Sequence, residues 1–134
     1  MNARYLVDTD WAINHLNGQT RTRQRLEELA GSGLGFSIIS LAEVYEGILY
    51  SRDPEKNERG LQDFLQDLTV IGIDEETSRL FGKERGRLRA EGKRVADFDL
   101  IIGVTARQHD LTLLTNNHRH FEDIEGLRIE SLSD

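Results

Sequence analysis

Acidic residues stand at three places where an apolar stretch of the sequence meets polar residues. LVDTD ends on Asp8 and Asp10, SLAEVYEG carries Glu43 three residues after Ser40, and VADFDLIIGVTA carries Asp99 at the start of an apolar run. Carboxylates brought to one place repel each other unless a cation or a shared proton compensates them. Mg²⁺ and Mn²⁺ prefer oxygen ligands, and a bound ion can acidify a water for phosphodiester hydrolysis. The three places together indicate a metal-assisted hydrolytic site.

Each acid taken singly also has an ordinary structural role. Asp8 or Asp10 can serve as a turn residue or as an N-cap. Ser40 and Glu43 fit the S-x-x-E capping box, in which the Glu side chain returns to the N-cap amide. The metal site is therefore indicated by the combination and by no single acid.

The elements that must position these acids follow from the apolar pattern. Runs rich in β-branched residues recur at RYLV, GFSII, TVIGI and LTLLT, and LRIES is a further short strand. Helices are predicted over about residues 10–17, 20–30, 41–51, 55–68, 75–91 and 98–109. This alternation predicts an α/β fold with a mainly parallel sheet, and ligands bind beyond the carboxyl ends of such strands. The acids are expected at that edge.

The composition limits the classes of protein. A chain of 134 residues and 15.3 kDa suits one domain, spanning residues 1–134. The absence of Cys excludes a disulfide scaffold and thiol catalysis. A net charge of −7 argues against coating nucleic acid by bulk charge. No apolar run approaches the roughly 20 residues of a membrane span and no signal peptide is recognised, so we expect a cytoplasmic protein.

Four short motifs in order resemble those of the PIN domain nucleases and, among them, the VapC-type toxin ribonucleases of VapBC toxin–antitoxin pairs. They are YLVDT at residues 5–9, SIISLAE at 37–43 with Gly47, DLIIGVTA at 99–106, and LTLLTNN at 111–117 with Phe121. The resemblance covers nearly the whole chain. It implies a three-layer α/β/α fold with a central sheet of four to five strands.

The resemblance also implies a function and a site. Asp8, Glu43 and Asp99 are expected to hold Mg²⁺ or Mn²⁺, with Thr9 and Ser40 orienting these acids. The expected activity is endonucleolytic cleavage of single-stranded cellular RNA, which inhibits translation and growth. The expected partners are a cognate VapB-type antitoxin and a second copy of the chain, with a larger assembly when the antitoxin binds.

Asp97 competes with Asp99 for the third acidic position. We assign it to Asp99 because the apolar helix motif begins directly on that residue, which leaves Asp97 as a helix cap. In the fourth motif Asn117 and His120 stand where an acidic residue is often found. An Asn oxygen can bind the metal or orient a metal-bound water, but it adds no charge. The number of bound ions, one or two, therefore stays open. His120 is expected in an exposed turn.

The segment KERGRLRAEGKR, at residues 83–94, is the clearest basic patch in the sequence. We predict that Arg85, Arg87 and Arg89 hold RNA phosphates beside the acidic site. The alternative is a solvated helix face with charge pairs between successive turns.

Two other functions fit part of the pattern. A haloacid-dehalogenase-type phosphatase would use Asp8 and Asp10 as nucleophile and general acid, although it leaves Glu43 without a role. A non-catalytic, magnesium-binding receiver-like domain would use Asp74 as the phosphoryl acceptor, and Glu43 and Asp99 would again have no role.

Overall fold

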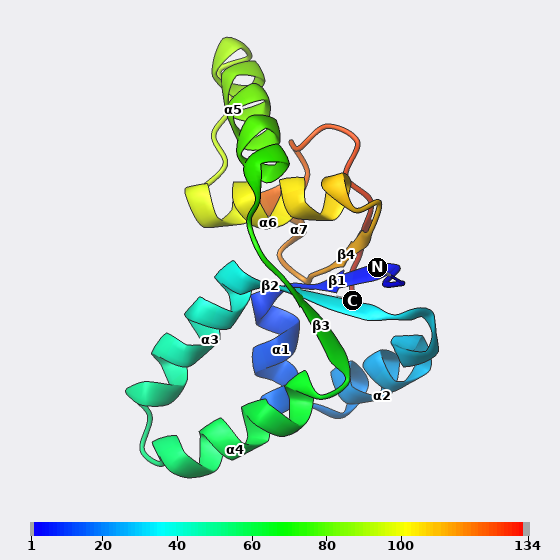
Figure 1. The fold of residues 1–134 in the computed structure, drawn as a ribbon, viewed down its shortest axis with the longest axis vertical. Helices are drawn as coiled ribbons and strands as arrows, with labels where there is room; N and C mark the ends of the chain where they lie inside the picture. The colour runs from blue at the N-terminus through cyan, green and yellow to red at the C-terminus, as the bar shows by residue number, and fades with distance from the viewer. Residues whose placement is uncertain (1, 133–134) are drawn as a thin grey trace.

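A five-stranded parallel sheet forms the centre of the computed structural model, which describes residues 2–132 (Figure 1). Its strands are β1 Tyr5–Val7, β2 Leu34–Ser37, β3 Leu68–Ile71, β4 Thr112–Leu114 and β5 Ile129–Glu130. They lie in the order β3-β2-β1-β4-β5, and every neighbouring pair is parallel. The chain therefore winds outward from β1 in both directions, which puts the topological switch point between β1 and β4.

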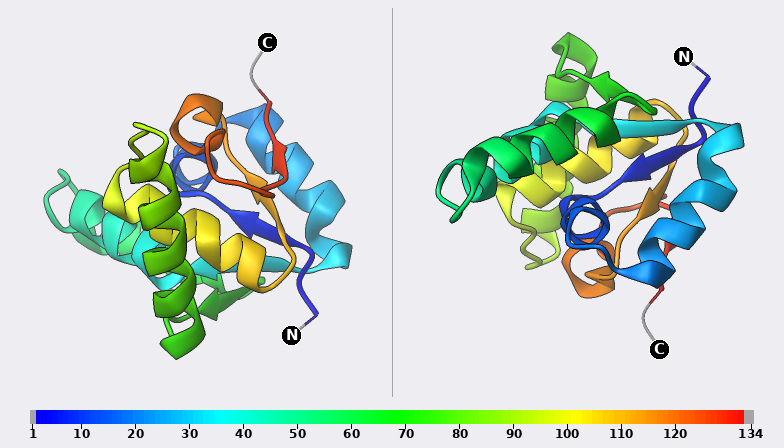
Figure 2. Two further views of the ribbon diagram at one scale, coloured as in Figure 1. Left: turned by 90° about the horizontal axis from the view of Figure 1, so that it is seen from above. Right: turned by 90° about the horizontal axis from the view of Figure 1, so that it is seen from below.

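Helices cover both faces of this sheet, so the predicted three-layer α/β/α fold is confirmed (Figure 2). One face carries α5 Glu75–Ala90, α6 Asp97–Gln108 and α7 His118–Phe121. The other carries α1 Thr9–Leu16, α2 Thr20–Leu29, α3 Ile38–Leu49 and α4 Pro54–Leu65, with a 3₁₀ turn at Ala30–Ser32. Among the described residues, no helix is long and apolar enough to cross a membrane.

Side-chain alternation along the central strands builds two cores. Leu6 and Leu113 pack with α5 and α6, whereas Val7 and Leu114 pack with Trp11 and the helices of the opposite layer. All five side chains are fully buried. Because successive strand residues point to opposite faces, the same short strands anchor both layers and fix the positions of the residues that follow them.

The second strand is shorter than predicted because a cap ends it. Ser37 is the N-cap of α3, and its side chain accepts a hydrogen bond of 3.1 Å from the Ile39 amide. Ser40 is therefore the third helical residue and Glu43 lies in the second turn. The predicted capping box between Ser40 and Glu43 is wrong.

Two further local predictions differ from the structure. His120, predicted in an exposed turn, is exposed but lies in the short helix α7 His118–Phe121. Asp97, predicted as a cap, is instead the first helical residue of α6, and the N-cap position belongs to Ala96. The Asp97 carboxylate forms an ion pair with Arg85 on α5 and makes no cap of α6.

Candidate active site

Asp8 lies at the switch point, directly after β1, and it is 3% exposed. Its amide donates a hydrogen bond of 2.9 Å to the carbonyl of Leu114, at the end of the neighbouring strand β4. Thr115 follows that strand, and its hydroxyl donates to Asp8 Oδ2 at 2.7 Å. The parallel pairing of β1 with β4 thus brings a buried carboxylate and a buried hydroxyl together at the carboxyl edge of the sheet.

Asp10 lies beside Asp8, in the first turn of α1. Its carboxylate accepts hydrogen bonds from the amides of Trp11 at 2.8 Å and Asn116 at 2.9 Å, and the Thr115 hydroxyl lies 3.3 Å from Oδ1. Burial and the charge of Asp10 raise the pKa of Asp8 from 3.8 to about 7. Asp10 was not predicted as part of the metal site, although the DTD spacing, which puts both carboxylates at one helix start, is a signal for it.

Glu43 reaches the same region from α3. The Thr9 hydroxyl donates to Glu43 Oε1 at 2.8 Å and also lies 2.9 Å from Ser40 Oγ. Thr9 is the residue after Asp8, so these contacts join the start of α1 to the second turn of α3. The hydroxyl of Ser40 is buried within this contact.

Asp99 belongs to the first turn of α6. Burial raises the pKa of its carboxyl, His120 opposes that rise, and the charge of Asp10 adds to it. The Nδ1 atom of His120, on α7, lies 3.4 Å from Asp99 Oδ2. Because Asp10 acts on the pKa of both Asp8 and Asp99, the carboxylates of α1 and α6 share one electrostatic environment.

The remaining predicted residues lie apart from this cluster or at its rim. The Asp97 side chain is 73% exposed and is paired with Arg85, away from the other acids. Asn117 is exposed, and its amide donates to the Thr115 hydroxyl at 3.0 Å. The structure therefore brings Asp8, Asp10 and Asp99 together, with Glu43 joined through Thr9.

The donor set suits a hard divalent cation in charge and in chemistry. Carboxylate oxygens are the ligands such ions prefer, and a cation would offset the burial of the Asp8 charge and its repulsion by Asp10, which together raise the pKa of Asp8. Within residues 2–132, no three acidic or His side chains form a ready-made metal-binding group. Hydrogen bonds from Thr9 and Thr115 hold two of the carboxylates, so water and substrate oxygens would supply further ligands.

The three arginines of the predicted RNA-binding patch differ in their contacts. Arg85 is paired with Asp97, and its guanidinium lies 5.2 Å from the ring centre of Phe81. Arg89 is exposed and makes no ion pair within the described part of the chain.

Arg87 is held within the protein. It donates to buried Glu84 at 2.7 and 2.9 Å and to the carbonyl of Asp123 at 2.7 Å. It also pairs with Glu91 and Glu125. Arg87 therefore fixes the 123–125 loop onto α5.

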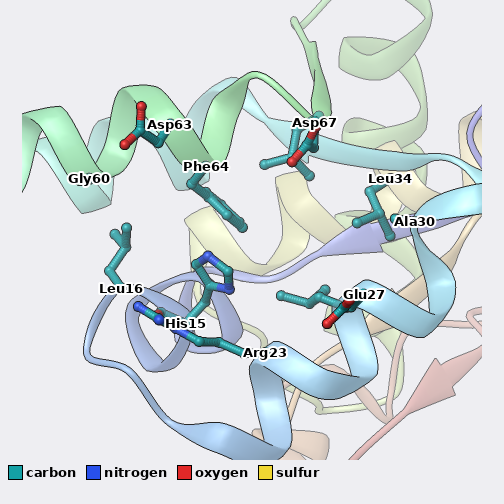
Figure 3. Close-up of a pocket in the computed structure, with 12 residues that line it drawn as sticks. His15, Leu16, Arg23, Glu27, Ala30, Leu34, Gly60, Asp63, Phe64 and Asp67 are labelled. Atoms are coloured by element: carbon teal, nitrogen blue, oxygen red, sulfur yellow. The ribbon is translucent and has the colours of Figure 1, made fainter.

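A cavity of about 500 Å³ lies away from these acids, between α1, α2 and α4 (Figure 3). Leu34 and Leu68, the first residues of β2 and β3, line it, so it lies at the opposite edge of the sheet from Asp8. Inside it, the His15 ring lies 4.7 Å from the Phe64 ring. It contributes no residue to the acidic site.

A parallel α/β sheet whose switch point gathers one buried and two half-buried carboxylates suits a metal-dependent hydrolase domain, and comparison with known proteins identifies the family. The family model described as "PIN domain" matches residues 5–127. The chain belongs to the PIN domain family, in which its relatives are VapC ribonucleases.

Particular relatives match over almost their full length. "Ribonuclease VapC2" of Haemophilus influenzae is 32% identical over 129 residues, which cover 96% of this chain and 97% of the relative. The solved structure of VapBC2 from Rickettsia felis bound to a promoter DNA fragment has a TM-score of 0.90 at 29% identity, covering 96% of this chain and 98% of that one. DNA-bound VapBC from Salmonella typhimurium has a TM-score of 0.88 at 31% identity, with the same coverage.

These findings remove the two alternative functions. Family membership contradicts the phosphatase, and Asp10 is held by two backbone amides instead of being free to act as an acid. Asp74, the acceptor in the receiver-like alternative, is the N-cap of α5 and forms a capping box with Thr77.

Proposed function

We propose that this chain is the toxin of a type II toxin–antitoxin pair, a Mg²⁺- or Mn²⁺-dependent endoribonuclease that cleaves single-stranded cellular RNA and so inhibits translation and growth. The observation that carries the proposal is the buried Asp8 carboxyl beside Asp10 at the switch point, with its pKa raised to about 7. Such a charge-rich site is suited to a cation and to the phosphate it would bind. The names of the VapC ribonucleases among the relatives support the choice of RNA.

In this proposal the acids divide the work with neighbouring hydroxyls. Asp8, Glu43 and Asp99 would hold the ion, which when bound supplies an acidified water and neutralises charge on the phosphodiester. Thr115 holds Asp8 in place through its 2.7 Å hydrogen bond, and Thr9 does the same for Glu43 at 2.8 Å. Each contact fixes the orientation of one carboxylate.

The substrate would reach the site past the start of α6. The exposed Arg89 and the Arg85 side chain lie on α5, the helix packed against α6, and are suited to phosphate binding. Arg87 has a smaller part in this proposal, because its guanidinium is already paired with Glu84.

We further propose a VapB-type antitoxin as partner, a homodimer that forms a larger assembly with it, and a cytoplasmic location. The solved relatives from Rickettsia felis and Salmonella typhimurium are described as VapBC, and this supports the antitoxin. Residues 1–134 would form one nuclease domain.

Purified protein incubated with single-stranded RNA tests the activity. We expect cleavage with Mg²⁺ or Mn²⁺ and none with a chelator, and near-complete loss in Asp8→Asn, Glu43→Gln and Asp99→Asn. Asp97→Asn is the matched control, since Asp97 lies in the same helical turn as Asp99 but faces Arg85. Full activity in all three site variants would contradict the proposal.

Expression in cells then identifies the substrate. RNA from cells producing wild-type protein or Asp8→Asn would be sequenced at its new 5′ ends. Growth arrest with cleavage sites confined to the wild type is expected. Identical profiles from two folded proteins, with no antitoxin present, would exclude a toxin ribonuclease.

A further inference from the structure

We propose that His120 is a nitrogen ligand of the metal site and that it shifts the site's preference from Mg²⁺ toward a first-row transition ion such as Mn²⁺. The inference rests on the proposed function, because it assigns a further ligand to the same site. It starts from one contact, in which the Nδ1 atom of His120 lies 3.4 Å from Asp99 Oδ2.

The backbone of His120 is fixed in a position that faces α6. Its amide donates to the carbonyl of Asn117 at 2.9 Å, and the next residue, Phe121, is fully buried in the core with α6 and β4. This anchoring brings α7 against α6 and holds the imidazole beside Asp99. The placement follows from core packing and does not depend on the metal.

The imidazole itself remains available. Its side chain is 57% exposed, and the structure records an ion-pair contact with Asp99 but no hydrogen bond to it among the described residues. The neighbouring ring of Phe121 lies 6.5 Å away, centre to centre. An exposed ring held beside Asp99 at the edge of an acidic cluster is suited to join the ligand set.

His118 on the same short helix shows the contrast. Its Nδ1 lies 3.3 Å from Glu122, outside the acidic cluster, and its side chain is 55% exposed. The two histidines therefore match in exposure and in helix but differ in the acid they face.

The chemistry of the nitrogen donor sets the preference. Mg²⁺ strongly favours oxygen ligands in a near-ideal octahedron, whereas transition ions accept imidazole readily. A neutral imidazole also contributes no negative charge, which weakens the pull on Mg²⁺ relative to a fourth carboxylate. Asp8, Glu43 and Asp99 with His120 thus make a mixed oxygen and nitrogen set.

Electron spin-echo spectroscopy of protein-bound Mn²⁺, with calorimetric titration of Mn²⁺ and Mg²⁺, tests this directly. We expect a ¹⁴N imidazole coupling in the wild type and in His118→Ala, and its loss in His120→Asp. The Mn²⁺ over Mg²⁺ affinity ratio is expected to fall about 10-fold in His120→Asp. Circular dichroism would establish that each variant is folded, and the exposure of His120 favours this.

The outcomes separate the two proposals. If the wild type binds Mn²⁺ in a way that Asp8→Asn abolishes, yet shows no ¹⁴N coupling, the role of His120 is wrong and the metal site stands. The same follows if the coupling persists in His120→Asp. If Asp8→Asn leaves binding of both ions unchanged, the metal site itself is wrong, and the role of His120 with it.

Discussion

The Thr115 hydroxyl donates a 2.7 Å hydrogen bond to the Asp8 carboxylate and joins residues 107 positions apart in the chain. Both groups are buried, and the same hydroxyl accepts a hydrogen bond of 3.0 Å from the Asn117 amide. One side chain therefore fixes the central acid and also starts the loop that leads to α7. Because strands β1 and β4 pair in register, this contact follows directly from the sheet.

Replacing Thr115 by Val should weaken both folding and cleavage. The variant keeps the shape but leaves Asp8 and the Asn117 amide without their partner, which costs about 1–3 kcal/mol for buried groups. Thermal unfolding and RNA cleavage measure the two effects, and Thr115→Ser, which keeps the hydroxyl, should recover most of each. A Val variant equal to wild type in both assays would show that the contact does not hold the acid.

The raised pKa of Asp8 predicts an unusual dependence of stability on pH. Between the ordinary pKa of 3.8 and the folded value of about 7, the folded state holds more protons than the unfolded state. The stability contributed by Asp8 is therefore fully present below pH 3.8, falls as pH rises toward about 7, and stays at its lowest level above that pH.

Asp8→Asn removes this dependence. In chelator, we expect its Tm to match the wild type at low pH and to exceed it by several degrees above pH 7. Thermal unfolding of both proteins across that range is the measurement, with Asp97→Asn as an exposed control that should track the wild type. Parallel curves for wild type and Asp8→Asn would mean that the Asp8 pKa is not raised.

Glu84 is predicted to matter for folding rather than for RNA. Its buried carboxylate accepts two hydrogen bonds from Arg87 and one of 2.8 Å from the Glu125 amide. Glu84→Ala should lower stability by about 1–3 kcal/mol, because the Glu125 amide loses its acceptor. Denaturant unfolding checks this, and Glu91→Ala at the C-cap of the same helix, an exposed partner of Arg87, should have a much smaller effect.

Arg89 is predicted to show the opposite behaviour. It is exposed and makes no ion pair among residues 2–132, so Arg89→Glu should change the free energy of unfolding by no more than about 0.5 kcal/mol. RNA affinity should fall, with a shallower dependence on salt, since fewer counterions are released. RNA binding is measured at several salt concentrations with and without Arg89→Glu. Both proteins carry Asp8→Asn, which is expected to prevent cleavage of the RNA during the measurement. Unchanged affinity and slope would place the phosphate contacts elsewhere.

Gly103 in α6 packs so closely against Ile124, in the loop after α7, that a Cβ would have to displace the Ile124 side chain. A Cβ at this position would lie 2.4 Å from Ile124 Cδ1 in the buried core. Gly103→Ala should therefore destabilise the fold by about 1–3 kcal/mol. Adding Ile124→Val removes that methyl group and should restore part of the loss, as measured by denaturant unfolding. If the stability changes of the two single variants simply add in the double variant, residues 103 and 124 do not clash.

The sequence by itself determined the α/β architecture and singled out the candidate acids of the site. Strand and helix periodicities are local, and caps such as Asp53 and Asp74 are encoded within a few residues of the helices they begin. Asp8, Glu43 and Asp99 follow from short motifs for the same reason. Local chemistry also misled, because S-x-x-E is the same pattern whether Ser40 is a cap or, as here, the third residue of a helix.

Only the tertiary structure decided which partner each side chain has. Asp97 and Asp99 are two residues apart on one helix, so they point in different directions, one to Arg85 and the other to His120. Arg87 and Arg89 differ for the same reason, one held by Glu84 and the other exposed.

The grouping of Asp10 with Asp8 and Asp99 has a similar origin. It depends on β4 lying beside β1, because the Asn116 amide that holds Asp10 follows β4, and on α6 packing over the sheet. These contacts join segments about 90 to 110 positions apart, and packing sets them, not local pattern.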